Sequence, residues 1–342
     1  MSHGSSETEQ TPHVSHASHG LLMVPVLRVF ALSMITLCFS FLVSNYLNFW
    51  WHWPGLSDLL SPRPTIRGLG WVQLAIYILP VLGVIALVMR SPSRALHEDS
   101  DMLSGLTAYL VRSAFWAVLL IGLADMVISF LRVEDMLVGV VGKELASDLG
   151  RSAFRGAYVH YPLLALSFII ALFNRTLGFD WLALLIVAAE IQIVIARFVF
   201  SYEQAFMADL VRFWYGALFL FASAYTLIQE GHVRVDILYT GFSERGKAWT
   251  NTLGSALLGM PLCWIVLTMG MWTRSNVITG PLLSYEVTQS GYGLYVKYLL
   301  ASFLLVFSVS MLTQFASYFL RNAAVLLHEP DFHSDLEEHA KI

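Results

Sequence analysis

The chain has 342 residues, of which 57% are hydrophobic and only 13% are charged, and its mean hydropathy is +0.65. A soluble globular domain is nearer half apolar and a quarter charged, so this composition predicts an integral membrane protein. The net charge of −4 leaves no basic face for a nucleic acid, and two cysteines are too few for a disulfide framework, a four-cysteine zinc site or an iron–sulfur site.

The first 20 residues are rich in Ser, His, Glu and Thr and contain no Lys or Arg. They therefore lack the positive start of a signal peptide, and we expect residues 1–20 to form a retained, disordered tail. The three histidines His13, His16 and His19 match no structural zinc spacing, so a solvated tail is preferred to a metal site.

Eight stretches are long and apolar enough to cross a bilayer core, which needs roughly 20 such residues per helix. Because backbone groups in lipid must be satisfied within their own segment, each stretch is expected to be a helix. The predicted fold is an all-α integral membrane protein with about eight transmembrane helices plus interfacial amphipathic helices. The expected spans are 29–51, 71–89, 103–131, 157–174, 181–200, 213–229, 248–273 and 298–320.

The segment 132–155, between the third and fourth spans, mixes acidic and basic residues with a regular apolar pattern. Leu137, Val141, Leu145 and Leu149 recur every four residues. This pattern predicts one amphipathic helix lying along the membrane interface.

Charge alone does not orient the chain. An even number of spans places both tails on one side, and the Lys and Arg residues divide equally between the two sides. The loop 230–247 is basic, with Arg234, Arg245 and Lys247, which favours a cytoplasmic position for that loop, for both termini and for the acidic tail 326–342.

Asp125 and Glu190 are the acids that lie well inside predicted spans. A carboxylate at the centre of a membrane helix costs about 2.5–3.5 kcal/mol, so each is a candidate for a proton or ion relay. The preferred interpretation is a protonated or paired acid that faces a neighbouring helix or a partner subunit. His160 is the one histidine in a span and lies near its end, which is typical of a hydrogen-bonding residue and offers no paired haem ligands.

A tryptophan, an acid and an arginine of the third span recur 65 positions later in the fifth. They are Trp116, Asp125 and Arg132, matched by Trp181, Glu190 and Arg197. Internal repeats are common in membrane transport proteins, but chance similarity between two apolar helices remains the alternative. No phosphate-binding loop, nucleophile elbow or zinc-protease motif occurs, so motor ATPase and common hydrolase chemistry are unsupported.

Three short motifs follow in order from the fifth span onward: R-F-V-F at 197–200, A-D-L-V-R-F at 208–213 and E-G-H-V-R-V-D at 230–236. With the basic turn 243–247, they make the stretch 181–321 resemble the small membrane subunit, the DctQ-like family, of tripartite ATP-independent periplasmic (TRAP) transporters. The resemblance suggests subunit-interface or structural roles for Arg197, Glu203, Asp209, Arg212, His232, Arg234 and Asp236.

Physical chemistry adds an expectation for the second motif. Glu203, Asp209 and Arg212 would lie on a short helix along the membrane surface, with Phe206, Met207 and Leu210 facing lipid or a partner. Phe206 stands where the family usually has Trp, and Ala208 replaces the first acid of the family's pair.

The resemblance implies a non-catalytic scaffold without a cofactor or metal of its own. Its partners would be a large membrane subunit, which carries the substrate and coupling-ion sites (sodium by family), and a periplasmic substrate-binding protein. The complex would import a small organic acid across the bacterial inner (cytoplasmic) membrane. Membrane lipid would surround the chain, whose termini would both be cytoplasmic.

The family usually has four spans, and the resemblance covers less than half of the chain. We therefore divide the sequence into a tail 1–20, a four-helix membrane extension 21–175, a DctQ-like domain 176–325 and an acidic tail 326–342. The extension is expected to enlarge the rigid framework or to contact the binding protein.

Two alternatives remain. A free-standing secondary carrier would need its own intramembrane ion site, for which only Asp125 and Glu190 could serve, so replacing both with amides would abolish uptake. A membrane enzyme or redox subunit would carry a chromophore visible in the absorption spectrum of the purified chain.

Overall fold

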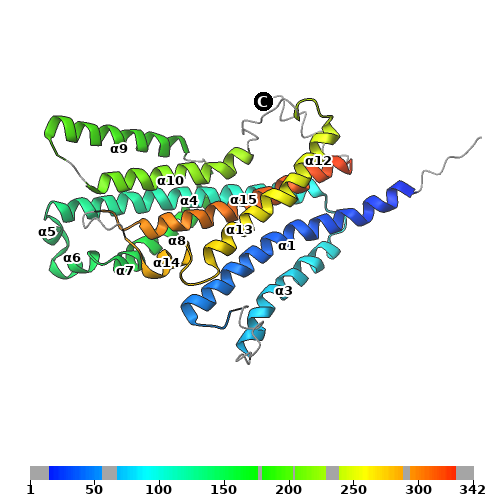
Figure 1. Cartoon of the computed structure of the whole chain (residues 1–342), viewed down its shortest axis with the longest axis horizontal. Coiled ribbons are helices and arrows are strands. Elements are labelled where there is room, and N and C mark those ends of the chain that lie inside the picture. The colour runs from blue at the N-terminus through cyan, green and yellow to red at the C-terminus, as the bar shows by residue number, and fades with distance from the viewer. Residues whose placement is uncertain are drawn as a thin grey trace, which may run out of the picture.

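The computed structural model describes residues 15–55, 68–175, 179–202, 205–228, 239–287 and 293–328. Every regular element within these ranges is a helix, which confirms the all-α class, and the long helices lie side by side in one bundle (Figure 1). The long helices are α1 (Ser15–Trp51), α3 (Leu69–Arg90), α4 (Leu96–Val133), α8 (Tyr161–Phe173), α9 (Phe179–Phe200), α10 (Ala205–Ile228), α13 (Met260–Met271) and α15 (Lys297–Leu326).

Eight helical segments among the described residues are long and apolar enough to cross a membrane, and each coincides with a predicted span. Two of them are composite. The first, Ser152–Phe173, joins α7 (Ser152–Arg155) to α8 through the π-helical turn η1 (Gly156–His160). The second, Glu244–Met271, joins α12 (Glu244–Gly254) to α13 through the π-helical turn η2 (Ser255–Gly259).

Both π-helical turns precede a proline by two residues, and this placement has a steric cause. Pro162 and Pro261 lack a backbone N–H and would clash with the carbonyls of Tyr158 and Leu257, four residues earlier. Widening the turn to a π-helix relieves that clash while the helix continues.

Helices α4 and α15 form the centre of the bundle, although one comes from the expected extension and the other from the expected DctQ-like domain. They pack against each other along much of their length, and α10 packs against both. Hydrogen-bonded small residues hold α4 to α15: the Ser317 hydroxyl lies 2.9 Å from Ser100 Oγ and 2.7 Å from Ser104 Oγ. The two regions therefore share one core.

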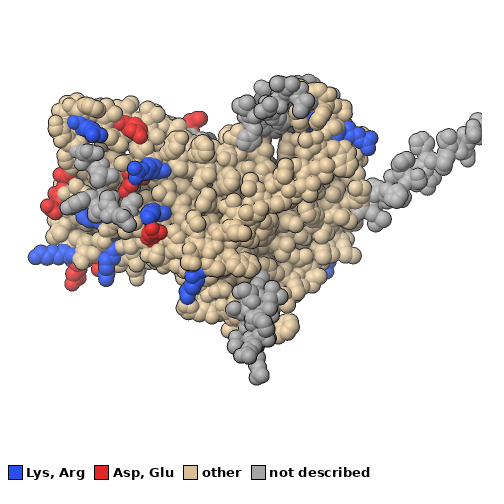
Figure 2. Space-filling view, in the orientation of Figure 1, with Lys and Arg blue, Asp and Glu red and all other residues tan. Residues whose placement is uncertain are grey.

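Two helices form the edges of the bundle. Helix α3 packs mainly against α1, and α9 packs mainly against α10. Figure 2 shows charged side chains gathered at one end of the molecule, over the short helices α5 (Leu137–Val141), α6 (Lys143–Leu149) and α7, while few are visible over the middle. This distribution suits a bundle whose middle lies in a membrane.

Two local predictions are wrong. Helix α1 begins at Ser15, so residues 15–20 are helical rather than a disordered tail, whereas residues 1–14 and 329–342 lie outside the described part of the chain. The single interfacial helix expected over 132–155 is instead three short helices. Gly142 separates the first two with a backbone φ of 83°, a conformation that favours glycine.

Candidate functional site

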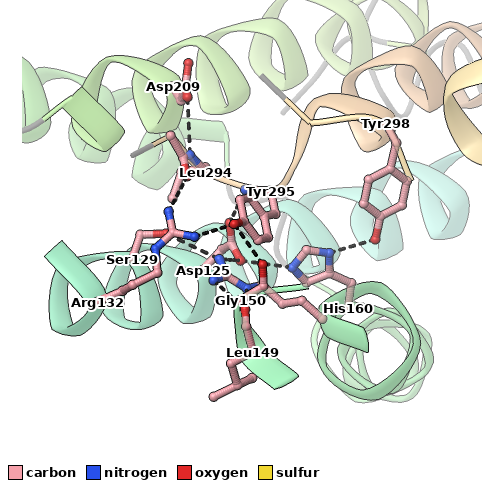
Figure 3. A network of polar contacts seen from close by, with 12 residues as sticks. Asp125, Ser129, Arg132, Leu149, Gly150, His160, Asp209, Leu294, Tyr295 and Tyr298 are labelled. Atoms are coloured by element: carbon pink, nitrogen blue, oxygen red, sulfur yellow. Dashed lines mark hydrogen bonds and ion pairs between the residues drawn. The ribbon is translucent and has the colours of Figure 1, made fainter. Parts of the chain in front are cut away.

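A buried polar cluster lies where the end of α4 meets α7, η1 and the segment that leads into α15 (Figure 3). Its centre is Asp125, whose side chain is fully buried. Asp125 Oδ1 accepts hydrogen bonds from Arg155 Nη1 at 2.7 Å and from His160 Nε2 at 3.2 Å. Its other oxygen accepts the backbone N–H of Tyr295 at 2.7 Å. Arg155 Nη1 also donates to Ser129 Oγ at 3.3 Å. We call Asp125, Ser129, Arg155, His160, Tyr295 and Tyr298 the polar clamp.

Arg155 reaches the clamp because it is the last residue of α7, in the turn just before η1. Its guanidinium is fully buried and donates from Nε and Nη2 to the Leu149 carbonyl, at 3.0 and 2.8 Å. The same group lies 4.1 Å from the centre of the Tyr295 ring. A carbonyl, a carboxylate and an aromatic face thus replace the water that a buried cation loses.

His160 extends the clamp to α15. Since a carboxylate can only accept, Nε2 of His160 donates to Asp125, and Nδ1 is hydrogen-bonded to the Tyr298 hydroxyl at 2.7 Å. Gly156, one turn earlier, lets η1 approach closely, because a Cβ there would lie 2.4 Å from the Tyr285 ring. His160 is therefore a hydrogen-bonding residue, as predicted, but it lies near the middle of the span Ser152–Phe173 and not close to its end, because the span begins earlier than expected.

The segment before α15 ties the clamp to two further helices. The Tyr295 hydroxyl donates to the Gly150 carbonyl at 3.0 Å, and Arg132 near the end of α4 hydrogen-bonds that same hydroxyl. The neighbouring Leu294 N–H donates to Asp209 Oδ2 on α10 at 3.2 Å. One short segment thus links α4, α7 and α10 to α15.

The contacts of the polar clamp indicate a structural role. Asp125 and Arg155 balance each other in charge, and both have hydrogen bonds to further groups. A buried pair satisfied in this way fixes geometry, and removing one partner is costly. Within the described ranges, no three His, Cys, Asp or Glu side chains lie close enough together to hold a metal ion.

A second buried ion pair lies near the other end of α4. Arg28 of α1 and Asp99 are both buried, and Arg28 Nε lies 2.7 Å from Asp99 Oδ2. Arg28 Nη1 also donates to the Ser91 carbonyl at 2.6 Å. Since Asp99 and Asp125 are 26 residues apart, the two pairs are separated by roughly 40 Å along α4.

The prediction of a short surface helix around Asp209 is wrong. Helix α10 runs without a break from Ala205, and Phe206, Met207 and Leu210 are buried inside the chain instead of facing lipid or a partner. They pack toward α4, where a Cβ on Gly122 would lie 3.3 Å from a Leu210 methyl. Asp209 can be buried there because it accepts the Leu294 N–H.

The other predicted residues do not gather with the clamp. The Arg212 side chain is exposed and lies 3.6 Å from Asp209, and Arg197 is exposed at the end of α9. Glu190, in the middle of α9, is also exposed and makes no hydrogen bond or ion pair with any residue that the structure describes. Glu203, His232, Arg234 and Asp236 lie outside the described residues.

Sequence reasoning missed Ser129, Arg155, Tyr295 and Tyr298 as members of the clamp. Arg155 was grouped with the interfacial charges because it follows several exposed charged residues. A signal was present: an intramembrane Asp needs a cation, and few basic residues border its span. Nothing in the sequence marks the two tyrosines, because Tyr295 and Tyr298, just before and at the start of α15, are far from Asp125 in the chain.

The fold and the polar clamp together define a polytopic helical membrane protein whose helices are joined by buried polar contacts. Residues 184–324, from α9 to α15, match the family model described as tripartite ATP-independent periplasmic transporters, DctQ component. Neither the curated proteins nor the solved structures contain a significant match. The matched region confirms the resemblance to the DctQ-like family, and four membrane-spanning segments precede it.

Proposed function

We propose that this chain is the small, non-catalytic membrane subunit of a TRAP-type secondary transporter. The observation that carries the proposal is the DctQ match over residues 184–324. A component of this family works with other chains, so we assign it a large membrane subunit and a periplasmic substrate-binding protein as partners.

The packing of the bundle supports a scaffold role. Helix α4 contacts both α10 and α15, and buried ion pairs tie it to its neighbours near each end. Such joints favour one fixed arrangement of helices. We propose that the chain widens the rigid frame against which a moving transport domain of the large subunit slides, and that the four preceding spans enlarge this frame.

The transport chemistry is assigned to the partner chains. Both carboxylate oxygens of Asp125 already accept hydrogen bonds, from Arg155, His160 and the Tyr295 N–H. Glu190 lies on α9, which packs mainly against α10, so the two intramembrane acids do not form a shared ion site. We therefore place the coupling ion, sodium, and the site for a small organic acid on the large subunit.

The location follows from the same assignment. We propose that the chain lies in the bacterial inner membrane with both termini in the cytoplasm. The end of the bundle formed by α5, α6 and α7 then faces the periplasm, on the side where a binding protein delivers substrate.

Reconstitution tests this function. Proteoliposomes that contain this chain and the large subunit, supplied with the binding protein and a sodium gradient, should accumulate a labelled organic acid. Omitting this chain should abolish uptake, and this chain alone should give none. Sodium-driven uptake by the chain alone would contradict the proposal and favour a free-standing carrier.

A further inference from the structure

Glu190 occupies the most costly position that a charged side chain can take in a membrane helix. It lies ten residues from Asp180 and ten from Phe200, the ends of the span. At a rise of 1.5 Å per residue it is roughly 15 Å from each end, which is the middle of a bilayer core of about 30 Å. Because it is exposed and unpartnered among the described residues, lipid would surround it if nothing else covered α9.

The face of α9 that carries Glu190 is defined by its helical neighbours. The residues three, four and seven positions away share its face of the helix. They are Ala183, Ile186, Val187, Ile193, Val194 and Arg197, of which Ile186 and Ile193 are half-buried and pack against the core. Val187 and Val194 are 54% and 52% exposed, whereas Leu182 and Ala189 face α10 and are buried. The exposed side chains next to Glu190 are therefore apolar, so a second helix that covers this face would exclude water from the carboxylate. We call Ala183, Val187, Glu190, Val194 and Arg197 the Glu190 face.

Helix α3 shows how this chain builds an edge that meets only lipid. Like α9, it packs mainly against one neighbour, α1. Between Trp71 and Met89 it contains no charged residue. Its one amide side chain, Gln73, is fully buried and donates to the Ser44 carbonyl of α1 at 3.4 Å. The outward position of Glu190 on the opposite edge is therefore not the pattern of a lipid-facing helix.

The third span indicates what an acid at this depth requires. Asp125 stands at the equivalent place in the similar segment of α4, and a buried Arg155 neutralises it. Within the part of the chain that is described, no basic group serves Glu190 in this way. A basic residue of another chain that approaches α9 at mid-membrane depth would supply the missing partner.

We propose that the Glu190 face docks a transmembrane helix of the large subunit, and that this helix carries a Lys or Arg opposite Glu190 at the middle of the membrane. The inference deepens the proposed function and rests on it, because the occupant is the large subunit assigned there. The family match begins at residue 184, so Glu190 lies inside the region typical of the small subunit.

Site-specific photocrosslinking tests the location of the contact. A photoreactive amino acid replaces Val194 on α9 or, as the matched control, Leu82 on the outer face of α3, which is 52% exposed. Cells express the full chain with the large subunit and the binding protein, and intact membranes are irradiated. We expect a covalent adduct with the large subunit from position 194 and none from position 82.

Charge exchange tests the chemistry. Glu190→Lys should reduce the large subunit recovered with the chain by at least about tenfold, because it sets two cations against each other in a desolvated contact. Gln192→Lys is the control, since it places a Lys side chain on the same helix about 200° away around its axis. Replacing the opposing basic residue of the large subunit with Glu should restore recovery of the Glu190→Lys chain.

Each outcome separates the two proposals. If the wild-type chain recovers the large subunit but position 194 gives no adduct, or an adduct only with a second copy of this chain, the docking face is wrong and the proposed function stands. Equal losses from Glu190→Lys and Gln192→Lys would also overturn the docking face. If the wild-type chain recovers no large subunit at all, both proposals fail.

Discussion

Replacing Arg155 with Met removes the cation of the polar clamp while keeping much of the volume of its side chain. Arg155 and Asp125 are both fully buried, so the substitution leaves a carboxylate inside the bundle without a charge partner. The Leu149 carbonyl also loses the two hydrogen bonds it accepts from the guanidinium. Two penalties therefore combine at one site.

The expected magnitude follows from these two losses. Breaking a fully buried ion pair by removing one partner costs about 3–5 kcal/mol, and an unsatisfied buried carbonyl adds about 1–3 kcal/mol. The double variant Asp125→Asn/Arg155→Met removes both charges, while the Asn oxygen still accepts the Tyr295 N–H. We expect it to be more stable than Arg155→Met alone by about 1–3 kcal/mol.

The assay is unfolding in mixed micelles, followed by helical circular dichroism as the mole fraction of a denaturing detergent rises. Arg212→Met is the matched control, because the Arg212 side chain is 73% exposed beside Asp209. Such a pair contributes about 0–1 kcal/mol. Equal losses for Arg155→Met and Arg212→Met, or a double variant no more stable than the single one, would refute the assignment of Arg155 as the buried counter-charge.

Three further substitutions test the packing by the same unfolding assay. Gly156→Leu should lower the free energy of unfolding by about 1–3 kcal/mol, because a Cβ there meets the Tyr285 ring, whereas Gly83→Ala has open space and should not destabilise; similar behaviour of the two would argue against the close approach of η1. Arg28→Met should cost more than Arg94→Met, since Arg28 is fully buried and Arg94 is 36% exposed, and less than Arg155→Met, since Arg94 remains 2.9 Å from Asp99; the reverse order of the Arg28 and Arg94 losses would contradict the pairing. Ser317→Ala should cost about 0.6–2 kcal/mol by removing the hydroxyl shared with Ser100 and Ser104, and no loss would mean that these contacts add nothing to the joining of α4 and α15.

The spans could be predicted from sequence because a bilayer imposes a minimum apolar length on every crossing helix. Residues 157–174 were identified as a span despite His160, since the apolar run continues on both sides of it. The helix at the start of α10 was misread, although its signal was present. Phe206, Leu210 and Phe213 recur at three- and four-residue spacing and join directly to the next span, which favours one buried helix.

The polar clamp could not be assembled from sequence alone. Asp125 and Arg155 are 30 residues apart, and Tyr295 lies a further 140 residues along the chain. Their meeting depends on how α4, α7 and the segment before α15 pack, which residue periodicity does not determine. The intramembrane acid was still a sound starting point, because its cost predicts a partner even where it does not say which one.

Co-expression of the full chain with the large subunit that we propose as its partner tests the central claim most directly. The two are purified together in a mild detergent through a tag on this chain, and the stoichiometry is measured by light scattering and quantitative mass spectrometry. A stable complex with one copy of each chain is the predicted result. A monodisperse preparation of this chain alone, with the well-expressed large subunit left in the unbound fraction, would contradict the scaffold function.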